Sequence, residues 1–228
     1  MGQEHIPLHM PLASYFDHSL LSPVARKADF ERIAAECRQY GFAMMAINSA
    51  ATKLCKQLLD GSGVHVGAAI GFPLGQTTIA VKEYEARNAI QNGADEIDYV
   101  INLTALKDGD DAYIKEEMER ITAICRDKEV ISKVIFETCY LTEDEIARLC
   151  GIASDVKPDY VKTSTGFGTH GATALHVALM KRLVGDAVKV KASGGIRDLD
   201  TCLAMIEAGA ERIGSSGSVA IVEAYHRR

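Results

Sequence analysis

The chain has 228 residues, of which 47% are hydrophobic, so it can bury one large core, and its formal net charge of −6 argues against nucleic acid as the main ligand. Its six cysteines form no CxxC pair, which excludes a recognisable zinc site and indicates reduced thiols. No apolar run approaches membrane length and no signal peptide is recognisable, so we expect a soluble, cytoplasmic protein with no membrane partner.

Short apolar or β-branched runs alternate along the chain with longer segments of helical period. Three helix starts carry capping signals, because a hydroxyl or carboxylate side chain can accept a hydrogen bond from the first backbone amides of a helix. These are Ser22 followed by Pro23, which predicts a helix toward Tyr40, Thr142 with Glu145 three residues later, and Asp198 or Asp200. The expected strands are Tyr15–Leu20, Phe42–Asn48, His65–Gly71, Glu96–Asn102, Ser132–Glu137, Tyr160–Thr165, Val188–Ser193 and Arg212–Ser215.

Eight strands, each followed by a helix, predict an α/β fold of one domain over residues 1–228, a (β/α)₈ TIM barrel. A doubly wound open sheet is the alternative, but it would normally use fewer strands, and the chain offers no GxGxxG motif in the required place. In a TIM barrel the chemistry lies at the carboxyl ends of the strands, and phosphate binds after the seventh and eighth. The residues expected there are Asp17, Asn48, Gly71, Asp98, Glu137, Lys162, Lys191 and Ser215.

Two lysines lie in apolar strands directly before small-residue turns. Lys162 precedes Thr163-Ser164-Thr165-Gly166, and Lys191 precedes Ala192-Ser193-Gly194-Gly195. A buried ammonium group costs several kcal/mol unless it is paired or loses its proton. A lone strand lysine can extend to solvent or form a structural ion pair. Two on adjacent strands favour a nucleophilic amine, Lys162, that a second cation keeps uncharged.

Asp98 is the expected partner of these lysines. Period-two alternation places Glu96, Asp98 and Asn102 on one face of a strand, toward the barrel lumen. A lumenal carboxylate needs a cationic partner, and Lys191 or Lys162 can supply it. Asp98 is therefore either part of a structural ion pair or the group that moves protons during formation of a Schiff base.

Glycine-rich turns follow the sixth, seventh and eighth strands. Backbone amides at such turns, with a helix behind them, can hold an anion, and Arg197 can add charge. Each turn alone is usually just loop closure, but their shared position predicts a phosphate site. The seven histidines show no HxH or HExxH spacing, so neither a metal nor a cofactor is predicted.

Six segments together resemble the deoxyribose-phosphate aldolase family over nearly the whole chain, in the same order. They are Asp17-His18-Ser19-Leu20-Leu21, Ile70-Gly71-Phe72-Pro73-Leu74-Gly75, Glu96-Ile97-Asp98, Phe136-Glu137-Thr138-Cys139, Val161-Lys162-Thr163-Ser164-Thr165-Gly166-Phe167 and Val190-Lys191-Ala192-Ser193-Gly194-Gly195-Ile196-Arg197. The resemblance implies a class I aldolase that reversibly cleaves 2-deoxy-D-ribose 5-phosphate to acetaldehyde and D-glyceraldehyde 3-phosphate.

The resemblance also implies roles for single residues. Lys162 matches the family's Schiff-base lysine, and Lys191 and Asp98 match its proton-transfer pair. The substrate and phosphate contacts would fall on Gly166, Gly194, Gly195, Arg197, Gly214, Ser216, Asp17 and Ser19. The chain departs from the family pattern at Ser19, Ala46, Ser49, His170 and Gly217, positions that bear on phosphate affinity and aldehyde preference.

Two other functions stay open. One is a related Schiff-base aldolase with a different phosphosugar preference, which turnover of phosphorylated and unphosphorylated deoxyribose would separate from the first. The other is a catalytically silent barrel that binds a phosphosugar as a sensor. The partners expected are a small phosphosugar and acetaldehyde, with no nucleic acid. Because barrels often pair through their outer helices, a homodimer or higher homo-oligomer is also expected.

Overall fold

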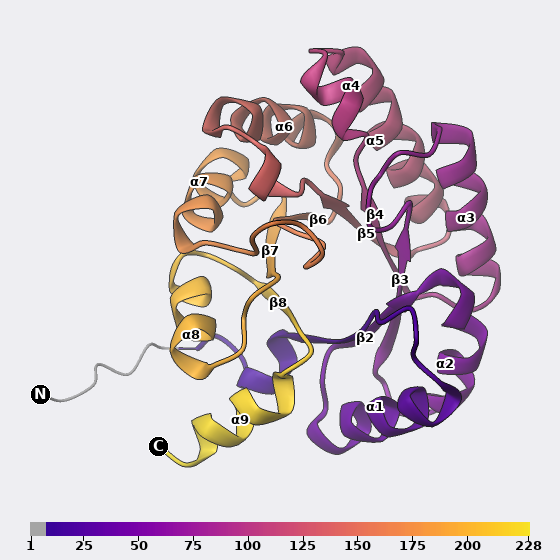
Figure 1. Cartoon of the computed structure of the whole chain (residues 1–228), viewed down its shortest axis with the longest axis vertical. Coiled ribbons are helices and arrows are strands. Elements are labelled where there is room, and N and C mark those ends of the chain that lie inside the picture. The colour runs from indigo at the N-terminus through magenta and orange to yellow at the C-terminus, as the bar shows by residue number, and fades with distance from the viewer. Residues whose placement is uncertain (1–7) are drawn as a thin grey trace, which may run out of the picture.

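Each predicted strand forms, and the eight strands pair in chain order in parallel until the last closes on the first. The computed structural model describes residues 8–228, and Figure 1 looks down the resulting barrel. The predicted (β/α)₈ barrel is therefore confirmed. The strands are β1 (Phe16–Leu20), β2 (Met44–Asn48), β3 (His65–Ile70), β4 (Glu96–Val100), β5 (Ile131–Ile135), β6 (Tyr160–Lys162), β7 (Lys189–Ser193) and β8 (Arg212–Ser215).

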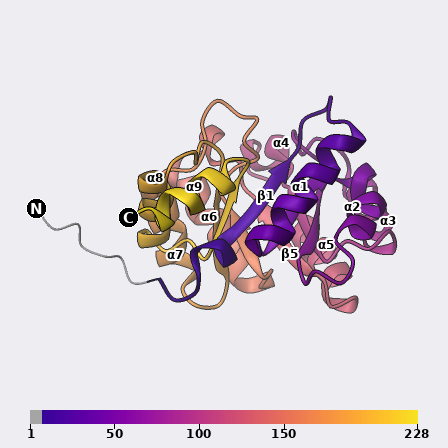
Figure 2. The same ribbon diagram turned by 90° about the horizontal axis from the view of Figure 1, so that it is seen from below.

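Helices surround the barrel in the order that the alternation predicts. Figure 2 shows β1 lying between α1 and α9, the helices that cover the seam where β8 pairs with β1. Within residues 8–228, no helix combines the length and apolarity needed to cross a membrane. The helices are α1 (Lys27–Tyr40), α2 (Thr52–Leu58), α3 (Ile79–Gln91), α4 (Leu103–Lys107), α5 (Asp111–Asp127), α6 (Glu143–Val156), α7 (Ala174–Val184), α8 (Leu199–Glu207) and α9 (Ser218–His226).

Two of the three predicted helix starts are confirmed. The Thr142 hydroxyl accepts a hydrogen bond from the Glu145 amide at 3.2 Å, and the Glu145 carboxylate accepts one from the Thr142 amide at 2.8 Å. Asp198, rather than Asp200, caps α8 by accepting from the Thr201 amide at 2.8 Å. Each such cap satisfies backbone donors that a helix leaves unpaired and stabilises it by about 1 kcal/mol.

The predicted start of the first helix, at Ser22 and Pro23, is wrong. Residues 22–25 form a turn, in which the Ala25 amide donates to the Ser22 carbonyl at 3.2 Å. The first helix begins at Lys27, because the Asp29 carboxylate accepts the Arg26 amide at 2.8 Å and closes the helix end there. Leu21, Ser22 and Pro23 instead form part of the wall of the cavity at the barrel mouth.

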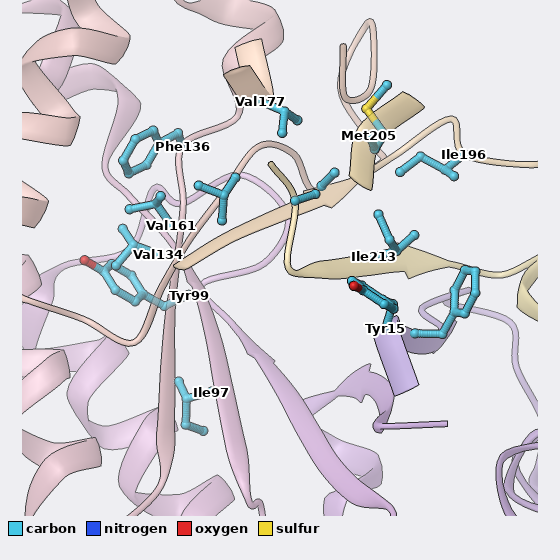
Figure 3. Packing of buried hydrophobic residues seen from close by; sticks show 14 of the residues in the cluster. Tyr15, Ile97, Tyr99, Val134, Phe136, Val161, Val177, Ile196, Met205 and Ile213 are labelled. Atoms are coloured by element: carbon cyan, nitrogen blue, oxygen red, sulfur yellow. The ribbon is translucent and has the colours of Figure 1, made fainter. Parts of the chain in front are cut away.

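The apolar core lies between the strands and the helices, not inside the barrel. On β4, Ile97 and Tyr99 point outward and are fully buried, as Figure 3 shows with Val134 and Val161 from the next two strands. Burying each such side chain contributes about 1.5–3 kcal/mol. Alternation then leaves the inward positions of the same strands to polar residues, and these fill the lumen.

Candidate active site

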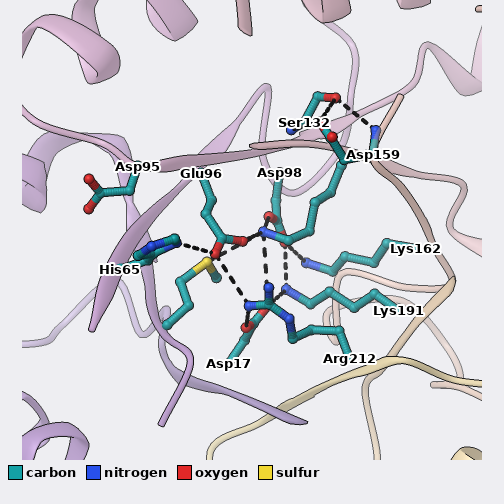
Figure 4. A network of polar contacts seen from close by, with 12 residues as sticks. Asp17, His65, Asp95, Glu96, Asp98, Ser132, Asp159, Lys162, Lys191 and Arg212 are labelled. Carbon is teal, nitrogen blue, oxygen red and sulfur yellow. Dashed lines mark hydrogen bonds and ion pairs between the residues drawn. The ribbon is translucent and has the colours of Figure 1, made fainter. Parts of the chain in front are cut away.

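The lumen of the barrel holds a cluster of seven charged side chains, here called the lumenal cluster. Strand register brings them together, because Asp98 lies opposite Lys133, and Lys191 lies between Lys162 and Arg212. Figure 4 shows Lys162, Lys191 and Arg212 pointing toward the carboxylates of Asp17, Glu96 and Asp98. The members are Asp17, Glu96, Asp98, Lys133, Lys162, Lys191 and Arg212, none more than 8% exposed.

Lys162 and Lys191 share one carboxylate oxygen. The Nζ atom of Lys162 donates to Asp98 Oδ2 at 2.8 Å, and that of Lys191 donates to the same oxygen at 2.7 Å. All three side chains are nearly inaccessible, at 4%, 1% and 3% exposure in the order named. The predicted contact between these residues is therefore present, because both amines point inward and lie within hydrogen-bonding distance of one Asp98 oxygen.

The electrostatics of this group favour an uncharged amine at Lys162. Burial, followed by the neighbouring Lys191 and Lys133 ammonium groups, lowers the pKa of Lys162 to about 8, while Asp98 opposes the shift. At pH 7 about one amine in ten is then uncharged, compared with about one in several thousand for a lysine in water. Burial alone would raise the pKa of Asp98, but Lys133, Lys162 and Lys191 together lower it well below its ordinary value.

Charge balance within the lumenal cluster also favours one uncharged amine. Within the described chain, the lumenal cluster contains four basic side chains and three carboxylates joined by ion pairs. A dry interior disfavours the one unmatched charge, so loss of a single proton makes the cluster neutral. His65 contacts Glu96 at 2.8 Å from the other end of the barrel, where its side chain is 46% exposed and screened by water.

A cavity of about 460 Å³ opens directly above the two lysines at the carboxyl ends of the strands. Lys162 and Lys191 form part of its wall, whereas Asp98 lies behind them. A small molecule in this cavity can therefore contact the amines directly, whereas Asp98 is separated from it by the two lysines. The loops after β1, β6, β7 and β8 supply most of the remaining wall.

The predicted phosphate residues all line this cavity. Gly194 and Gly195 both have positive φ, 84° and 77°, which exposes backbone in a turn that other residues rarely adopt. Gly214 faces Lys191, since a Cβ there would lie 3.2 Å from the lysine Cε, so glycine makes room for that side chain. The predicted set that lines the cavity comprises Gly166, Gly194, Gly195, Arg197, Gly214, Ser216 and Ser19.

Asp17, which was predicted with these residues, lies away from the cavity. It is the second residue of β1 rather than its last, is fully buried, and does not line the cavity. One of its oxygens accepts from Arg212 at 2.7 Å and the other pairs with Lys191. Its position supports a role in holding Lys191 rather than in contacting substrate.

Asn102 corrects the predicted lumenal face. Strand β4 ends at Val100, and the Asn102 side chain accepts from the Ala105 amide at 3.2 Å, capping α4 instead of entering the lumen. Glu137, in contrast, holds a hydrogen bond at the carboxyl end of the barrel, since it accepts from the Thr165 amide at 3.2 Å. That contact fixes the turn that carries Gly166.

The Gly71–Gly75 segment packs at the rim of the cavity through one aromatic contact. The Phe72 ring meets the Phe167 ring edge to face, with centroids 5.4 Å apart. Phe167 lines the cavity, so this pair joins the loops after β3 and β6 above the site. Ala46, one of the departures from the family pattern, also lines the cavity.

Sequence reasoning missed Lys133 and Arg212. Lys133 is fully buried and its Nζ donates to Asp98 Oδ1 at 2.7 Å, while Arg212 contacts Glu96 at 3.3 Å as well as Asp17. The sequence signal that could have found Lys133 was its position as a lysine two residues before the end of an apolar strand. Residues 8–228 contain no group of three His, Cys, Asp or Glu side chains arranged to hold a metal ion.

A closed (β/α)₈ barrel whose buried lysines pair with a carboxylate beneath an open cavity places the protein among the TIM-barrel enzymes. The family model of the DeoC/LacD family aldolases matches residues 12–226, so the chain belongs to this aldolase family. The resemblance read from the motifs is thereby confirmed.

Individual relatives agree with the family over nearly the whole chain. The deoxyribose-phosphate aldolase of Bacteroides thetaiotaomicron is 55% identical over 214 residues, which cover 94% of this chain and 90% of the relative. The deoxyribose-phosphate aldolase of Lactobacillus acidophilus is 53% identical over 216 residues, which cover 95% of this chain and 91% of the relative. The solved tetrameric structure of deoxyribose phosphate aldolase from Aeropyrum pernix superposes with a TM-score of 0.89 at 32% identity, covering 96% of this chain and 93% of that chain.

Proposed function

We propose that the protein is a class I aldolase that reversibly cleaves 2-deoxy-D-ribose 5-phosphate to acetaldehyde and D-glyceraldehyde 3-phosphate. The observation that carries this proposal is the pair of Lys162 and Lys191 amines on one Asp98 oxygen, at the base of an open cavity. The names of the relatives, at 53–55% identity, support the choice of substrate.

In the proposed mechanism the uncharged Lys162 amine attacks the C1 aldehyde of the open-chain sugar. The carbinolamine loses water to give an iminium ion, which draws electrons from the C2–C3 bond. The C3 hydroxyl loses its proton as that bond breaks, and C3 leaves as the aldehyde of D-glyceraldehyde 3-phosphate. The remaining enamine takes a proton at C2, and water releases acetaldehyde and the free amine.

Asp98 and Lys191 are the proposed proton carriers for these steps, acting through water. Asp98 can accept a proton from the carbinolamine nitrogen and return it, because its lowered pKa keeps it ionised. Lys191 lines the cavity beside Lys162 and can donate to an oxygen that leaves as water. The iminium nitrogen withdraws electrons from the sugar, so this route assigns no step to a metal.

Borohydride trapping tests the proposal. Incubation with acetaldehyde and sodium borohydride should add one reduced two-carbon unit to the intact chain, and peptide mapping should place it at position 162. A trapped unit is expected because the reductant converts the iminium to a stable secondary amine. An intact mass that does not change, or an adduct at another lysine, would contradict the assignment.

The proposed phosphate subsite can be tested through Gly171, which packs against the Gly194 turn. A Cβ at position 171 would overlap the Gly194 backbone carbonyl, so Gly171→Ala must displace one of the two loops. We expect the KM for deoxyribose 5-phosphate to rise about ten- to a hundredfold, with little change in kcat.

Two measurements complete that experiment. Activity on unphosphorylated deoxyribose should change far less than activity on the phosphate ester, because only the ester uses the displaced turn. Gly151→Ala is the matched control, since that glycine lies in α6 with open space around its missing side chain. Equal losses on both substrates would argue against the turn as a phosphate subsite.

We also propose that the protein works in the cytoplasm as a homo-oligomer. A tetramer is named for the Aeropyrum pernix relative, and here large apolar side chains remain exposed on outer helices, with Tyr84 on α3 at 73% and Leu175 on α7 at 66%. Light scattering after size-exclusion chromatography would decide the state, and a mass of one chain at micromolar concentration would refute it.

A further inference from the structure

Lys133 is the lumenal lysine that the proposed chemistry does not use. It lies at the centre of β5, is fully buried, and unlike Lys162 and Lys191 does not line the cavity. Its Nζ donates to Asp98 Oδ1 at 2.7 Å and forms a second, short ion pair with Glu96 Oε2. It therefore contacts the proposed proton carrier on the side away from the substrate.

We propose that Lys133 is a positioning residue, a permanent cation that keeps Asp98 ionised and turns its Oδ2 toward Lys162 and Lys191. This role rests on the proposed function. It adds a third lysine to the site, one that acts through Asp98 and never touches the substrate.

The two carboxylate oxygens of Asp98 accept hydrogen bonds from different lysines. Oδ1 is held by Lys133 from below, which leaves Oδ2 as the shared acceptor of the two cavity lysines. A carboxylate with an unpaired oxygen in a dry lumen would turn to satisfy it, and either cavity lysine could then be lost as a partner. The contact with Lys133 removes that freedom.

Lys133 also separates two carboxylates that would otherwise compete. Glu96 and Asp98 are two residues apart on β4 and face the same lumen, with the Lys133 ammonium between them. Without it, two neighbouring carboxylates favour sharing one proton, and a protonated Asp98 could no longer accept from Lys162. Burial lowers the pKa of Lys133, but Asp98, Glu96 and Asp17 together raise it, so it stays charged across the working range.

The other groups around Lys133 do not substitute for it. Arg212 reaches Asp17 and Glu96 but forms no ion pair with Asp98 in the described chain. The Tyr160 ring lies 6.0 Å from the Lys133 ammonium, and the Met44 sulfur lies 3.4 Å away, so both are neutral neighbours. The charged groups that face it are Asp17 on β1, Glu96 and Asp98 on β4, Lys162 on β6, Lys191 on β7 and Arg212 on β8.

The test compares pH profiles of borohydride trapping and of kcat/KM. Lys133→Met in a Glu96→Gln background removes one cation and one anion together, so the lumen stays balanced and the chain can fold. In the double variant we expect the rising limb of both pH profiles to lie about one pH unit higher than in Glu96→Gln alone. The reason is that Lys162 and Asp98 both lose a neighbouring positive charge. Activity at pH 7 should fall about tenfold as a consequence.

A second buried pair provides the matched control. Lys82 on α3 and Glu117 on α5 are both fully buried, with Nζ and Oε1 2.6 Å apart, and lie outside the lumen. Lys82→Met with Glu117→Gln should lower the melting temperature but leave the rising limb in place. A limb that moves equally in both double variants, or in neither, would overturn the role of Lys133.

The same experiment separates this inference from the function on which it rests. The unaltered protein must first give an adduct at Lys162, and its absence would reject the proposed function and the role of Lys133 together. An adduct in the unaltered protein with an unshifted limb in the Lys133 variant would reject the role alone.

Discussion

Lys162→Ala is expected to lower kcat by about 10⁴-fold or more, because no other amine can form the proposed iminium in the same position. Lys191 lies close by, but it forms ion pairs with both Asp17 and Asp98, and using it as the nucleophile would remove one of the two proposed proton carriers. Turnover is measured from the release of D-glyceraldehyde 3-phosphate, and trapping with borohydride should fail in the same variant.

The thermal stability of a Lys162 variant should respond differently from its activity. Removing Lys162 leaves three basic side chains facing three carboxylates, so the lumenal cluster becomes balanced without releasing a proton. Lys162→Met fills the volume as well, and its melting temperature should equal or exceed that of the unaltered protein. This outcome distinguishes a residue retained for chemistry from one retained for folding.

Lys189→Ala is the control for the loss of a barrel lysine. Lys189 starts the strand that carries Lys191, but it is exposed at the opposite end of the barrel and reaches the Tyr160 ring at 5.6 Å. Its removal should leave kcat within about twofold, since an exposed contact of this kind contributes little. Full turnover by Lys162→Ala would reject the assignment of the nucleophile.

The sequence was sufficient for the fold and for most of the residues that line the cavity. Alternating segments predicted the barrel, and Lys162 and Lys191 stood out because each precedes a small-residue turn at a strand end. The inward direction of Asp98 followed from the period of a strand. These are local patterns, and local patterns can be read one segment at a time.

What the sequence could not supply is the pairing across the barrel. Lys133 contacts Asp98 because β4 and β5 are in a particular register, and register between strands is set by three-dimensional packing. Asp17 illustrates the same limit: β1 continues three residues beyond it to Leu20 and pairs it with Met44 and Gly214, which places Asp17 deep in the lumen rather than at its mouth. The Ser22 signal failed because a nearby Asp29 offered an alternative cap.

Lys191→Leu is expected to raise the pKa of Lys162. Burial is the largest cause of the present value of about 8, and burial remains in this variant, but the Lys191 ammonium adds to the lowering and would be lost. A higher pKa means fewer uncharged amines at pH 7, so the rising limb of kcat/KM should move to higher pH by about one unit. Activity at pH 7 should fall further, by about 10²–10⁴-fold in all, because a proton carrier is also removed.

Two readouts separate the electrostatic effect from the proton-transfer effect. The pH dependence of trapping with acetaldehyde reports mainly the amine, whereas kcat/KM reports both. Lys191→Arg keeps the positive charge beside Asp17 and Asp98, so its limb should stay near that of the unaltered protein even where its rate is low. If the Leu variant keeps the original limb, or the Arg variant shifts as far as the Leu variant, the charge of Lys191 does not tune Lys162, and desolvation alone accounts for its uncharged amine.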